Sequence, residues 1–551
     1  MIIVSLVKVS LLLGSRLIIN DLSWEIQDGH KIGLIGPNGV GKSSLLKLIT
    51  GELYPEPGGS IVLAKGVTIG YLPQQIDFSP ELTAFDIAFS GNYRIHELRA
   101  ELNHIETRLR TEEVYNNPKE LASTLDRQNK LGEEYHNLGG DNYENHVRET
   151  LIELGFLEDD ILKPVYTLSC GQKKLVGLAR LLLQRPSLLL LDEPDKHLDL
   201  AGKEYLEKFI GGYQGAVVIV SHDRYLLDGV VTHIAEISDG KITQFRGDYS
   251  SYIVDKEEKL TRQYEIYNIQ QREIARLEAA IKRYALWAKL YSNEKFANRA
   301  RAIQGRLDRI DRIERTKIDV RKVDINNIGW RGSTKVLELV QVEKYIGSNR
   351  ILNNINLIIR HGERVGLIGA NGTGKTVLFK IISGLDIPDS GEIVLGPSVK
   401  LGYYSQQGES LAGDQTLLDA VRYKGELSES DAIALLIHYL FSYKQVYQKV
   451  KELSGGELSR LQLALLMLSE PNFLLLDEPT NNLDIPSAEV LENVLSDFIG
   501  TVLVISHDRY FLDRTVEQVI ELQDGNFEVY PGCYSDYALR KALKIPHITK
   551  N

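Results

Sequence analysis

Two short stretches of the chain contain the residues needed to hold phosphate groups. Each follows an apolar run and reads Gly-x4-Gly-Lys-Ser/Thr, at residues 36–43 and 369–376. The glycines let successive backbone N–H groups face phosphates at a helix N-terminus, and the lysine reaches the β- and γ-phosphates. The sequence therefore predicts two sites for ATP. The residues expected to bind it are Gly36, Pro37, Asn38, Gly39, Val40, Gly41, Lys42, Ser43 and Ser44, and in the second stretch Gly369, Ala370, Asn371, Gly372, Thr373, Gly374, Lys375, Thr376 and Val377.

An Asp-Glu-Pro step ends a second apolar run in each half of the chain. A carboxylate at the end of a buried strand lies beside the phosphate-binding loop, where it holds Mg²⁺ together with the loop hydroxyl. The glutamates that follow, Glu193 and Glu478, are candidate general bases for an attacking water. A solvated turn is the structural alternative for such a step. The expected metal ligands are Ser43 and Asp192 in the first half and Thr376 and Asp477 in the second.

These motifs recur in the same order in both halves, so the chain contains an internal repeat. GLIGPNGVGKSS (33–44) matches GLIGANGTGKTV (366–377), and VSHDRYLLD (220–228) matches ISHDRYFLD (505–513). Lys42 and Lys375 are 333 residues apart, but Asp192 and Asp477 are only 285 apart. The first half therefore carries an insertion, which we place at about 76–165. Its apolar residues recur at helical spacing among charges, which predicts a solvated helical hairpin.

A basic segment, 249–322, separates residues 1–248 from 323–551. Apolar residues seven apart run from Ile253 to Ile281 and again from Phe296 to Ile310. This heptad pattern, broken at Ser292–Asn293, predicts an antiparallel helical hairpin. Residues 255–322 contain 18 Lys and Arg against 11 Asp and Glu, so this part is +7 and the rest of the chain is −18. The length and charge favour a binding arm, while a strut between the halves is the alternative.

The overall composition is that of a globular protein. Of 551 residues 43% are hydrophobic and 25% charged, and no apolar run of about 18 residues occurs. Two cysteines are too few for a disulfide framework or a zinc site. The apolar start, 1–14, lacks a basic leader and a cleavage site, which favours an opening strand. We therefore expect a cytoplasmic protein with no membrane domain.

Further motifs resemble those of the ATP-binding-cassette superfamily. LSCGQ (168–172) and LSGGE (453–457) match its signature, and KHLD (196–199) and NNLD (481–484) match its D-loop. The resemblance implies two α/β P-loop domains, each with a helical and a small antiparallel β subdomain, and ATP held between them. Adenine is then expected to stack on Tyr345 in the second half. The aligned stretch of the first half offers Leu12 instead of an aromatic residue. The resemblance also implies ATP contacts by Ser169, Gly171, Ser454, Gly455 and Gly456, contacts to ATP and Mg²⁺ by Gln74 and Gln406, and catalytic roles for His222 and His507.

Two such domains without membrane spans, joined by a charged helical linker, resemble the ABC-F family of ribosome-associated ATPases. FRGDYSSYIVDKEEK (245–259) and ANRARAIQGRLDRIDRIE (297–314) carry this part of the resemblance. It implies ATP hydrolysis, a translation or antibiotic-protection role, a linker that contacts rRNA and the P-site tRNA, and a monomer whose cassettes pair. The ATPase subunit of a separate membrane transporter is the alternative. Aromatic residues near the linker apex either stack on nucleotides or pack between the two helices: Tyr284, Trp287, Tyr291 and Phe296.

The first half departs from the family pattern at three positions. Cys170 replaces a glycine, Leu175 an arginine and Asp195 a threonine. On the family's arrangement, the second half's signature closes the site built on Lys42 (site one), and the first half's signature closes the site built on Lys375 (site two). All three departures then surround site two. Because a Cβ at Cys170 would intrude where glycine allows close approach, we expect site one to dominate hydrolysis.

Overall fold

The computed structural model describes residues 1–14, 16–110, 117–238, 240–291, 294–310, 334–347, 349–405 and 413–544. The chain divides into two compact units. One contains residues 1–244 together with 323–551, and the other is the segment 245–322. Among the described helices, none is long and apolar enough to cross a membrane.

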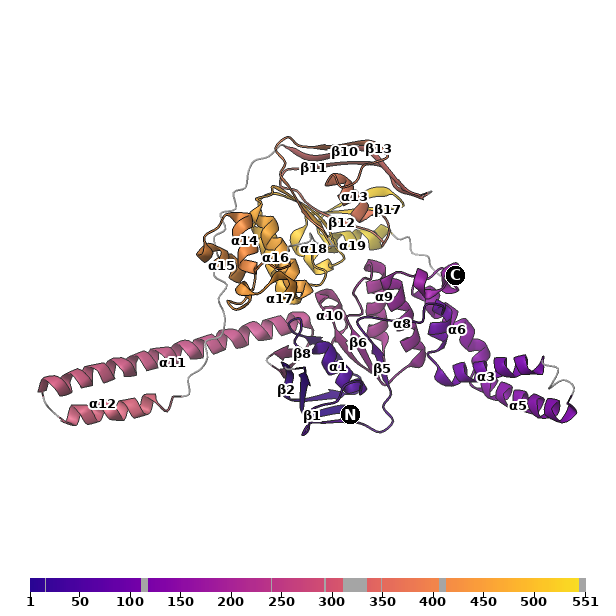
Figure 1. Cartoon of the computed structure of the whole chain (residues 1–551), viewed down its shortest axis with the longest axis horizontal. Helices are drawn as coiled ribbons and strands as arrows, with labels where there is room; N and C mark the ends of the chain where they lie inside the picture. The colour runs from indigo at the N-terminus through magenta and orange to yellow at the C-terminus, as the bar shows by residue number, and fades with distance from the viewer. Residues whose placement is uncertain are drawn as a thin grey trace. The chain divides into compact units, whose positions relative to one another are not determined.

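The first half contains two sheets (Figure 1). The apolar start forms β1 (Ile2–Leu13), as predicted, which pairs with β2 (Arg16–Gln27) and β4 (Ser60–Leu63) in an antiparallel sheet. The larger sheet has the order β5-β6-β7-β3-β8-β9. Every residue of β6 and β7 is buried, which is why these strands read as continuous apolar runs. The bounds are β3 (Lys31–Ile35), β5 (Ile69–Leu72), β6 (Leu188–Asp192), β7 (Ala216–Val220), β8 (His233–Ser238) and β9 (Lys241–Arg246).

The second half repeats both sheets. Its antiparallel sheet has the order β11-β10-β13, and the larger sheet has the order β14-β15-β16-β12-β17-β18. Here too the parallel strands bring their carboxyl ends to one edge, where the phosphate-binding loop and the acidic step meet. The bounds are β10 (Lys335–Ile346), β11 (Asn349–Arg360), β12 (Arg364–Ile368), β13 (Ser390–Leu395), β14 (Leu401–Tyr404), β15 (Phe473–Asp477), β16 (Thr501–Ile505), β17 (Gln518–Gln523) and β18 (Asn526–Pro531).

Helices complete each half. In the insertion, α3 (Tyr93–Leu109) and α5 (Pro118–Asn137) lie against each other, held in part by an ion pair between Arg94 Nη2 and Glu134 Oε1 (2.6 Å). The other helices of the first half are α1 (Lys42–Thr50), α2 (Ala84–Phe89), α6 (Gly140–Glu153), α7 (Glu158–Ile161), α8 (Cys170–Gln184), α9 (Leu200–Gly212) and α10 (Arg224–Val230). Those of the second half are α13 (Lys375–Ile382), α14 (Leu417–Gly425), α15 (Glu429–His438), α16 (Gly455–Leu468), α17 (Ile485–Asp497), α18 (Arg509–Thr515) and α19 (Tyr534–Lys544).

The described part of the segment 245–322 forms a helical hairpin of its own. It consists of α11 (Tyr249–Tyr291) and α12 (Glu294–Leu307), which pack together and are linked by Arg306 and Glu273. The side chains of Tyr284, Trp287 and Phe296 contact one another near the apex, so these rings pack between the helices. The side chain of Tyr291 lies outside the described residues. The architecture that the resemblance implies, with two α/β P-loop halves, is confirmed, and so is the helical hairpin linker.

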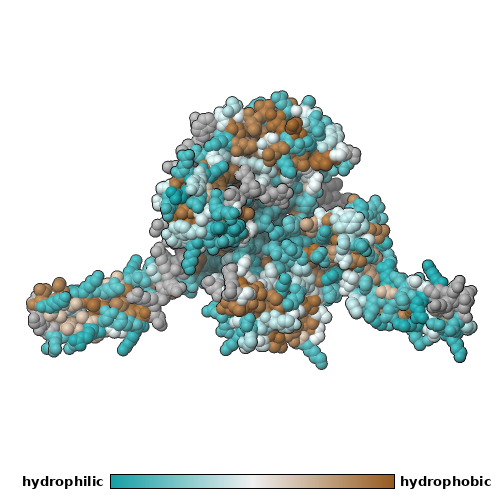
Figure 2. All heavy atoms as spheres, in the orientation of Figure 1, coloured by the Kyte–Doolittle hydropathy of each residue, from teal (hydrophilic) through white to brown (hydrophobic). Residues whose placement is uncertain are grey.

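Apolar side chains remain exposed on this hairpin (Figure 2). The exposed residues of α11 include Ile266, Ile269, Leu286 and Leu290. Charged residues lie between them, among them Arg283 and, on α12, Arg299 and Arg301. The hairpin therefore presents both cations and apolar groups to its surroundings.

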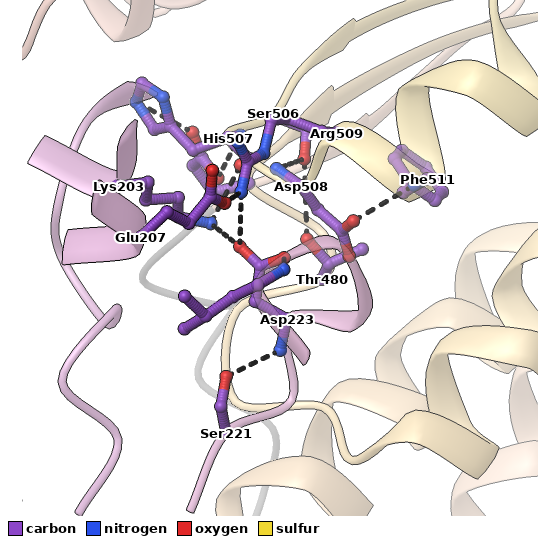
Figure 3. A network of polar contacts seen from close by, with 12 residues as sticks. Lys203, Glu207, Ser221, Asp223, Thr480, Ser506, His507, Asp508, Arg509 and Phe511 are labelled. Atoms are coloured by element: carbon purple, nitrogen blue, oxygen red, sulfur yellow. Dashed lines mark hydrogen bonds and ion pairs between the residues drawn. The ribbon is translucent and has the colours of Figure 1, made fainter. Parts of the chain in front are cut away.

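The two halves of the large unit are joined by matching ion pairs, of which Figure 3 shows the one between Arg509 and Glu207. Arg224 of the first half binds Glu492 of the second, and Arg509 of the second binds Glu207 of the first. Each arginine also lies over a tyrosine of the other half, Arg224 at 3.8 Å from the Tyr510 ring and Arg509 at 5.0 Å from that of Tyr225. The halves are thus held together by two related sets of contacts.

The two ion pairs differ in burial, so their contributions to stability can be compared by removing the glutamate of one pair at a time. The Glu492 side chain is 3% exposed and also binds Arg514, whereas the Glu207 side chain is 24% exposed. Loss of one partner of a buried ion pair costs about 3–5 kcal/mol. We expect Glu492→Ala to lower the midpoint of urea unfolding, followed by circular dichroism, clearly more than Glu207→Ala does. Equal shifts for the two variants would contradict this account.

Candidate nucleotide-binding sites

Both phosphate-binding loops adopt a backbone that requires glycine at defined positions. In the first loop Gly36, Gly39 and Gly41 have φ of 151°, 74° and 104°, and the second loop repeats this pattern with φ of 153°, 83° and 98°. A Cβ at Gly36 would lie 2.7 Å from the carbonyl oxygen of Ile237. Side chains are thus excluded from these turns, which leaves the loop N–H groups accessible at the N-termini of α1 and α13.

The loop lysines are buried and directed at their own loops. Lys42 Nζ donates to the carbonyl oxygens of Gly36 (2.7 Å) and Pro37 (3.2 Å), and Lys375 Nζ donates in the same way to its loop. Burial lowers the pKa of both lysines, and neighbouring carboxylates oppose this shift. An anionic phosphate brought to either loop would meet a poorly solvated ammonium group, which strengthens their attraction.

The donor set beside each loop fits Mg²⁺. Asp192 and Asp477 are each 1% exposed, and burial raises the pKa of both carboxyls. Thr376 Oγ1 donates to Asp477 Oδ1 at 3.4 Å, and Ser43 stands in the same relation to Asp192. One oxygen of each carboxylate has no hydrogen-bond donor among the described residues. A buried carboxylate oxygen next to a hydroxyl is a suitable ligand pair for a hard divalent cation.

Glu193 and Glu478 occupy equivalent positions with a backbone seldom adopted by residues other than glycine. Their φ values are 47° and 50°, in the left-handed region where such strain often marks functional sites. Glu193 Oε2 accepts a hydrogen bond from Gln74 Nε2 (2.7 Å) and lies 3.6 Å from Lys196 Nζ. Burial opposes its charge, but Lys196 and Gln74 outweigh burial, and the pKa of Glu193 lies below its ordinary value.

Glu478 has a different environment from Glu193. Burial raises the pKa of Glu478 to about 7. Its Oε1 lies 3.5 Å from His507 Nε2, and its Oε2 accepts a long hydrogen bond from the His507 backbone N–H (3.4 Å). The two candidate bases therefore share a backbone position and differ in their partners.

The two histidines with expected catalytic roles, called switch histidines below, are uncharged at neutral pH. Burial and Lys42 lower the pKa of His222 to about 4, and burial, Lys375 and Lys203 lower the pKa of His507 to about 3. Neither ring nitrogen of His222 has a hydrogen-bond partner among the described residues, although both are buried. These neutral rings line the same cavity as the loops, where each can donate one hydrogen bond and accept another.

Each phosphate-binding loop contacts the D-loop of the other half. The Asn38 N–H donates to Asp484 Oδ2 (3.1 Å), and Asn38 Nδ2 donates to the Asn482 carbonyl (3.2 Å). In the second site Asn371 Nδ2 donates to the His197 carbonyl (3.2 Å). His197 and Asn482 both have φ of 67°, so the accepting carbonyls are presented by equivalent strained turns. Each site is therefore built from both halves of the chain.

The signature motifs open helices that face these sites. Ser169 caps α8 and Ser454 caps α16, each through a capping box in which the serine accepts from the N–H three residues on. A Cβ at Gly171 would lie 2.5 Å from the His197 carbonyl oxygen, and one at Gly456 would lie 2.8 Å from that of Asn482. The second glycine of each signature is therefore required by the D-loop beside it.

Cys170, whose Cβ we expect to intrude on the approach to the γ-phosphate, is not crowded by neighbouring protein atoms. It is exposed, and at its counterpart Gly455 the nearest atom to an added Cβ, the Asn482 Cβ, is 3.9 Å away. No described protein atom therefore obstructs this position, and the ranking of site one above site two, which concerns the approach to the phosphate, stays a prediction. The close approach to the D-loop is made at the next residue of the signature, which is a glycine in both halves.

One cavity of about 990 Å³ brings most of the candidate residues together. Those that line it from the first half are Asn38, Gly39, Gly41, Lys42, Ser43, Ser44, Gln74, Ser169, Gly171, Glu193 and His222. Those from the second half are Asn371, Gly372, Gly374, Lys375, Thr376, Val377, Ser454, Gly455, Gly456, Asp477, Glu478 and His507. The candidates that do not line it are Gly36, Pro37, Val40, Asp192, Gly369, Ala370, Thr373 and Tyr345. Gln406 lies outside the described residues.

Tyr345, the expected adenine platform, does not line this cavity. Tyr345 is 43% exposed and lies 5.8 Å from the Arg350 guanidinium, while its neighbour Ile346 lines the cavity together with Ile351. Successive residues of a strand point to opposite faces, so a shift of one residue exchanges the aromatic ring for an aliphatic side chain. In the first half Leu13 and Ile18 line the cavity in place of Leu12.

Two buried lysines of the site were missed by motif reasoning. Lys174 Nζ donates to the Glu193 carbonyl, and Lys203 Nζ donates to the carbonyl of His507 in the other half. The repeat contained a signal for both, because 285 residues further on stand Ser459 and Ala488. A charge that replaces a small residue at an equivalent buried position indicates a specific partner.

Comparison with known proteins agrees with this geometry. A family model described as "ABC transporter" matches residues 19–196 and 352–481, and a second model with the same description matches 235–325. The chain is 36% identical to the putative ATP-binding protein YdiF of Bacillus subtilis, over 99% of this chain and 84% of that one.

Two further relatives are similar over nearly the whole chain. ABC transporter F family member 2 of Arabidopsis thaliana is 33% identical over 96% of this chain and 77% of its own length. The energy-dependent translational throttle protein EttA of Haemophilus influenzae is 34% identical over 95% of this chain and 92% of its own.

A solved structure shows the same tandem fold. It is that of the archaeal ribosome recycling factor aABCE1 in complex with the stalk protein aP1, with a TM-score of 0.60, 18% identity, and coverage of 97% of this chain and 92% of that one. The family models and relatives together show that the chain belongs to the ABC-F family of ATP-binding-cassette proteins and is an ATPase.

Proposed function

We propose that the chain binds and hydrolyses ATP at two composite sites in order to act on the ribosome during translation. The observation that carries the proposal is the reciprocal contact between each phosphate-binding loop and the opposite D-loop. ATP between the halves would bridge surfaces that already touch, and its hydrolysis would remove part of that bridge. Site occupancy is thereby coupled to the contact between the cassettes.

Within each site the residues have distinct roles in this proposal. The loop N–H groups and Lys42 or Lys375 bind the β- and γ-phosphates, and the signature serine and glycine of the other cassette complete the γ-phosphate contacts. Mg²⁺, held by the loop hydroxyl and the aspartate, with Gln74 or Gln406 close by, would neutralise developing charge on the phosphates. The ligand pairs are Ser43 with Asp192, and Thr376 with Asp477.

Glu193 and Glu478 are the proposed bases that take a proton from the attacking water. His222 and His507, neutral at pH 7, are proposed to hold the γ-phosphate or the water by hydrogen bonds rather than by charge. Both candidate bases line the cavity beside the phosphate-binding loops. Proton removal and phosphate binding would therefore take place in one cavity.

The partner is proposed from the hairpin and the relatives. EttA is named as a translational throttle, and the hairpin between the cassettes is basic where the rest of the chain is acidic. Backbone phosphates of rRNA and of the P-site tRNA would attract its cations without sequence selection. Because ribosomes are the proposed partner, the proposed location is the cytoplasm. The proposed oligomeric state is a monomer whose two cassettes pair with each other. Antibiotic protection is one form of this translational role.

The first test concerns the proposed bases. Glu193→Gln combined with Glu478→Gln should lower ATP turnover by roughly 10²–10⁴-fold, because a general base contributes about that much. ATP binding, followed with a fluorescent analogue, should persist because the loops and metal ligands are unchanged. The double variant should co-sediment with ribosomes in ATP more strongly than wild type. Turnover equal to wild type would show that these glutamates are not the bases.

The second test concerns the hairpin. Arg299 and Arg301 are exposed on α12, and Arg262 is exposed near the start of α11. Arg299→Gln with Arg301→Gln should weaken ribosome binding and reduce the slope of log affinity against log salt by roughly one to two, since each phosphate contact contributes about one. ATP turnover without ribosomes should stay at the wild-type level. Arg262→Gln serves as the matched control with little expected effect, and an equal loss for both variants would argue against binding by the apex.

A further inference from the structure

Comparison of the two cassettes reveals a paired exchange next to the second site. After the acidic step the second cassette has Thr480, and on the following helix it has Ala488. The equivalent residues of the first cassette, 285 positions earlier, are Asp195 and Lys203. One cassette therefore has two uncharged residues where the other has a carboxylate and an ammonium group.

The exchange places a buried cation at the contact between the cassettes (Figure 3). Lys203 is 8% exposed, and its Nζ donates to Asp223 Oδ2 at 2.8 Å. The same Nζ donates to the backbone carbonyl of His507, in the second cassette, at 2.9 Å. Asp223 is itself fixed, because its other oxygen caps α10 through the N–H of Leu226 (3.1 Å).

Three carboxyl groups keep this ammonium charged. Burial opposes its charge, but Asp223, Asp195 and Asp508 outweigh burial and raise the pKa of Lys203 above its ordinary value. A charged donor makes the stronger hydrogen bond to a carbonyl. The bond to His507 therefore joins a fixed, charged group of the first cassette to the loop that carries a switch histidine of the second.

The first site has no equivalent of this bond. Ala488 lies at the matching position of α17, and its side chain has no hydrogen-bond donor. His222 is instead adjacent to Asp223, which the same lysine binds from within its own cassette. From the opposite cassette Arg509 Nη2 lies 3.9 Å from Asp223 Oδ2, next to His222, but among the described residues a lysine hydrogen bond to the histidine carbonyl occurs at the second site alone.

We propose that Lys203 is a positioning residue for ATP hydrolysis at site two, holding the His507 loop from the opposite cassette so that this site is assembled only while the cassettes are in contact. The proposal rests on the function assigned above to Glu478 and His507. Lys203 acts through the backbone carbonyl of His507, whereas the loop of His222 is approached across the interface by Arg509, through the side chain of Asp223.

The competing explanation is that Lys203 only neutralises buried carboxyl groups. The chain offers a variant that separates the two roles. Lys203→Ala with Asp195→Thr gives the first cassette the residues of the second, removing one positive and one negative charge together. Thr480 shows that threonine fits there, with its Oγ1 3.4 Å from Ser506 Oγ. A neutralising role would be restored by this double variant, but the bond to His507 would not.

The experiment measures ATP turnover with one site active at a time. The Glu193→Gln change inactivates site one and leaves site two active, and the Glu478→Gln change inactivates site two and leaves site one active. In the Glu193→Gln chain, Lys203→Ala should lower kcat by roughly 10- to 100-fold, as expected for loss of a hydrogen bond to a charged group, with a smaller change in KM for ATP. In the Glu478→Gln chain the same change should lower kcat much less. Adding Asp195→Thr should recover the thermal unfolding midpoint without recovering kcat at site two.

Two outcomes would overturn the proposal. One is an equal loss of kcat at both sites, and the other is recovery of site-two turnover by the double variant. Failure of the proposed bases is visible separately, because Glu193→Gln and Glu478→Gln would then leave turnover unchanged before Lys203 is altered.

Discussion

The structure depends on one constraint, which is that each phosphate-binding loop meets the D-loop of the opposite half of the chain. The turn that holds phosphate in one cassette is bound by the D-loop of the other, through Asn38 and Asp484 at one site and Asn371 and His197 at the second. The residues that each cassette contributes to these contacts therefore have to be positioned by the interface between the cassettes. The two buried arginines, each paired with a glutamate of the other half, provide this positioning, because a buried charge separated from its partner is costly.

The duplication also explains how the two sites came to differ without loss of the fold. Loops, strained glutamates and capping serines are the same in both, since each is required by backbone geometry. The differences lie in side chains behind these elements, where Lys174, Asp195 and Lys203 replace small or uncharged residues. Buried charges have to be exchanged in sets, because one alone would be left without compensation. The first cassette thus carries a charged network where the second has hydroxyl and methyl groups.

Much of the fold and of the site was predictable, because the chemistry is encoded locally. A glycine-rich turn before Lys42 or an acidic step after four apolar residues needs little more than its own sequence to form. The helical hairpin followed from heptad spacing for the same reason. Contacts between the cassettes were less accessible, since Lys203 and His507 are 304 residues apart and no local pattern joins them. The position of Tyr345 and the space around Cys170 depended on strand facing and backbone distances that motifs do not specify.

The composite nature of the sites can be measured by combining changes across the two cassettes. Gly456→Ala places a Cβ 2.8 Å from the Asn482 carbonyl oxygen, beside the loop of Asn38, and should disable site one from the second cassette. Steady-state ATP turnover of Gly456→Ala with Glu193→Gln should equal that of Glu193→Gln alone, because both changes affect one site. Gly456→Ala with Glu478→Gln should abolish turnover, because each change disables a different site. The reverse pattern, with turnover lost in the first combination and retained in the second, would show that each site lies within a single cassette.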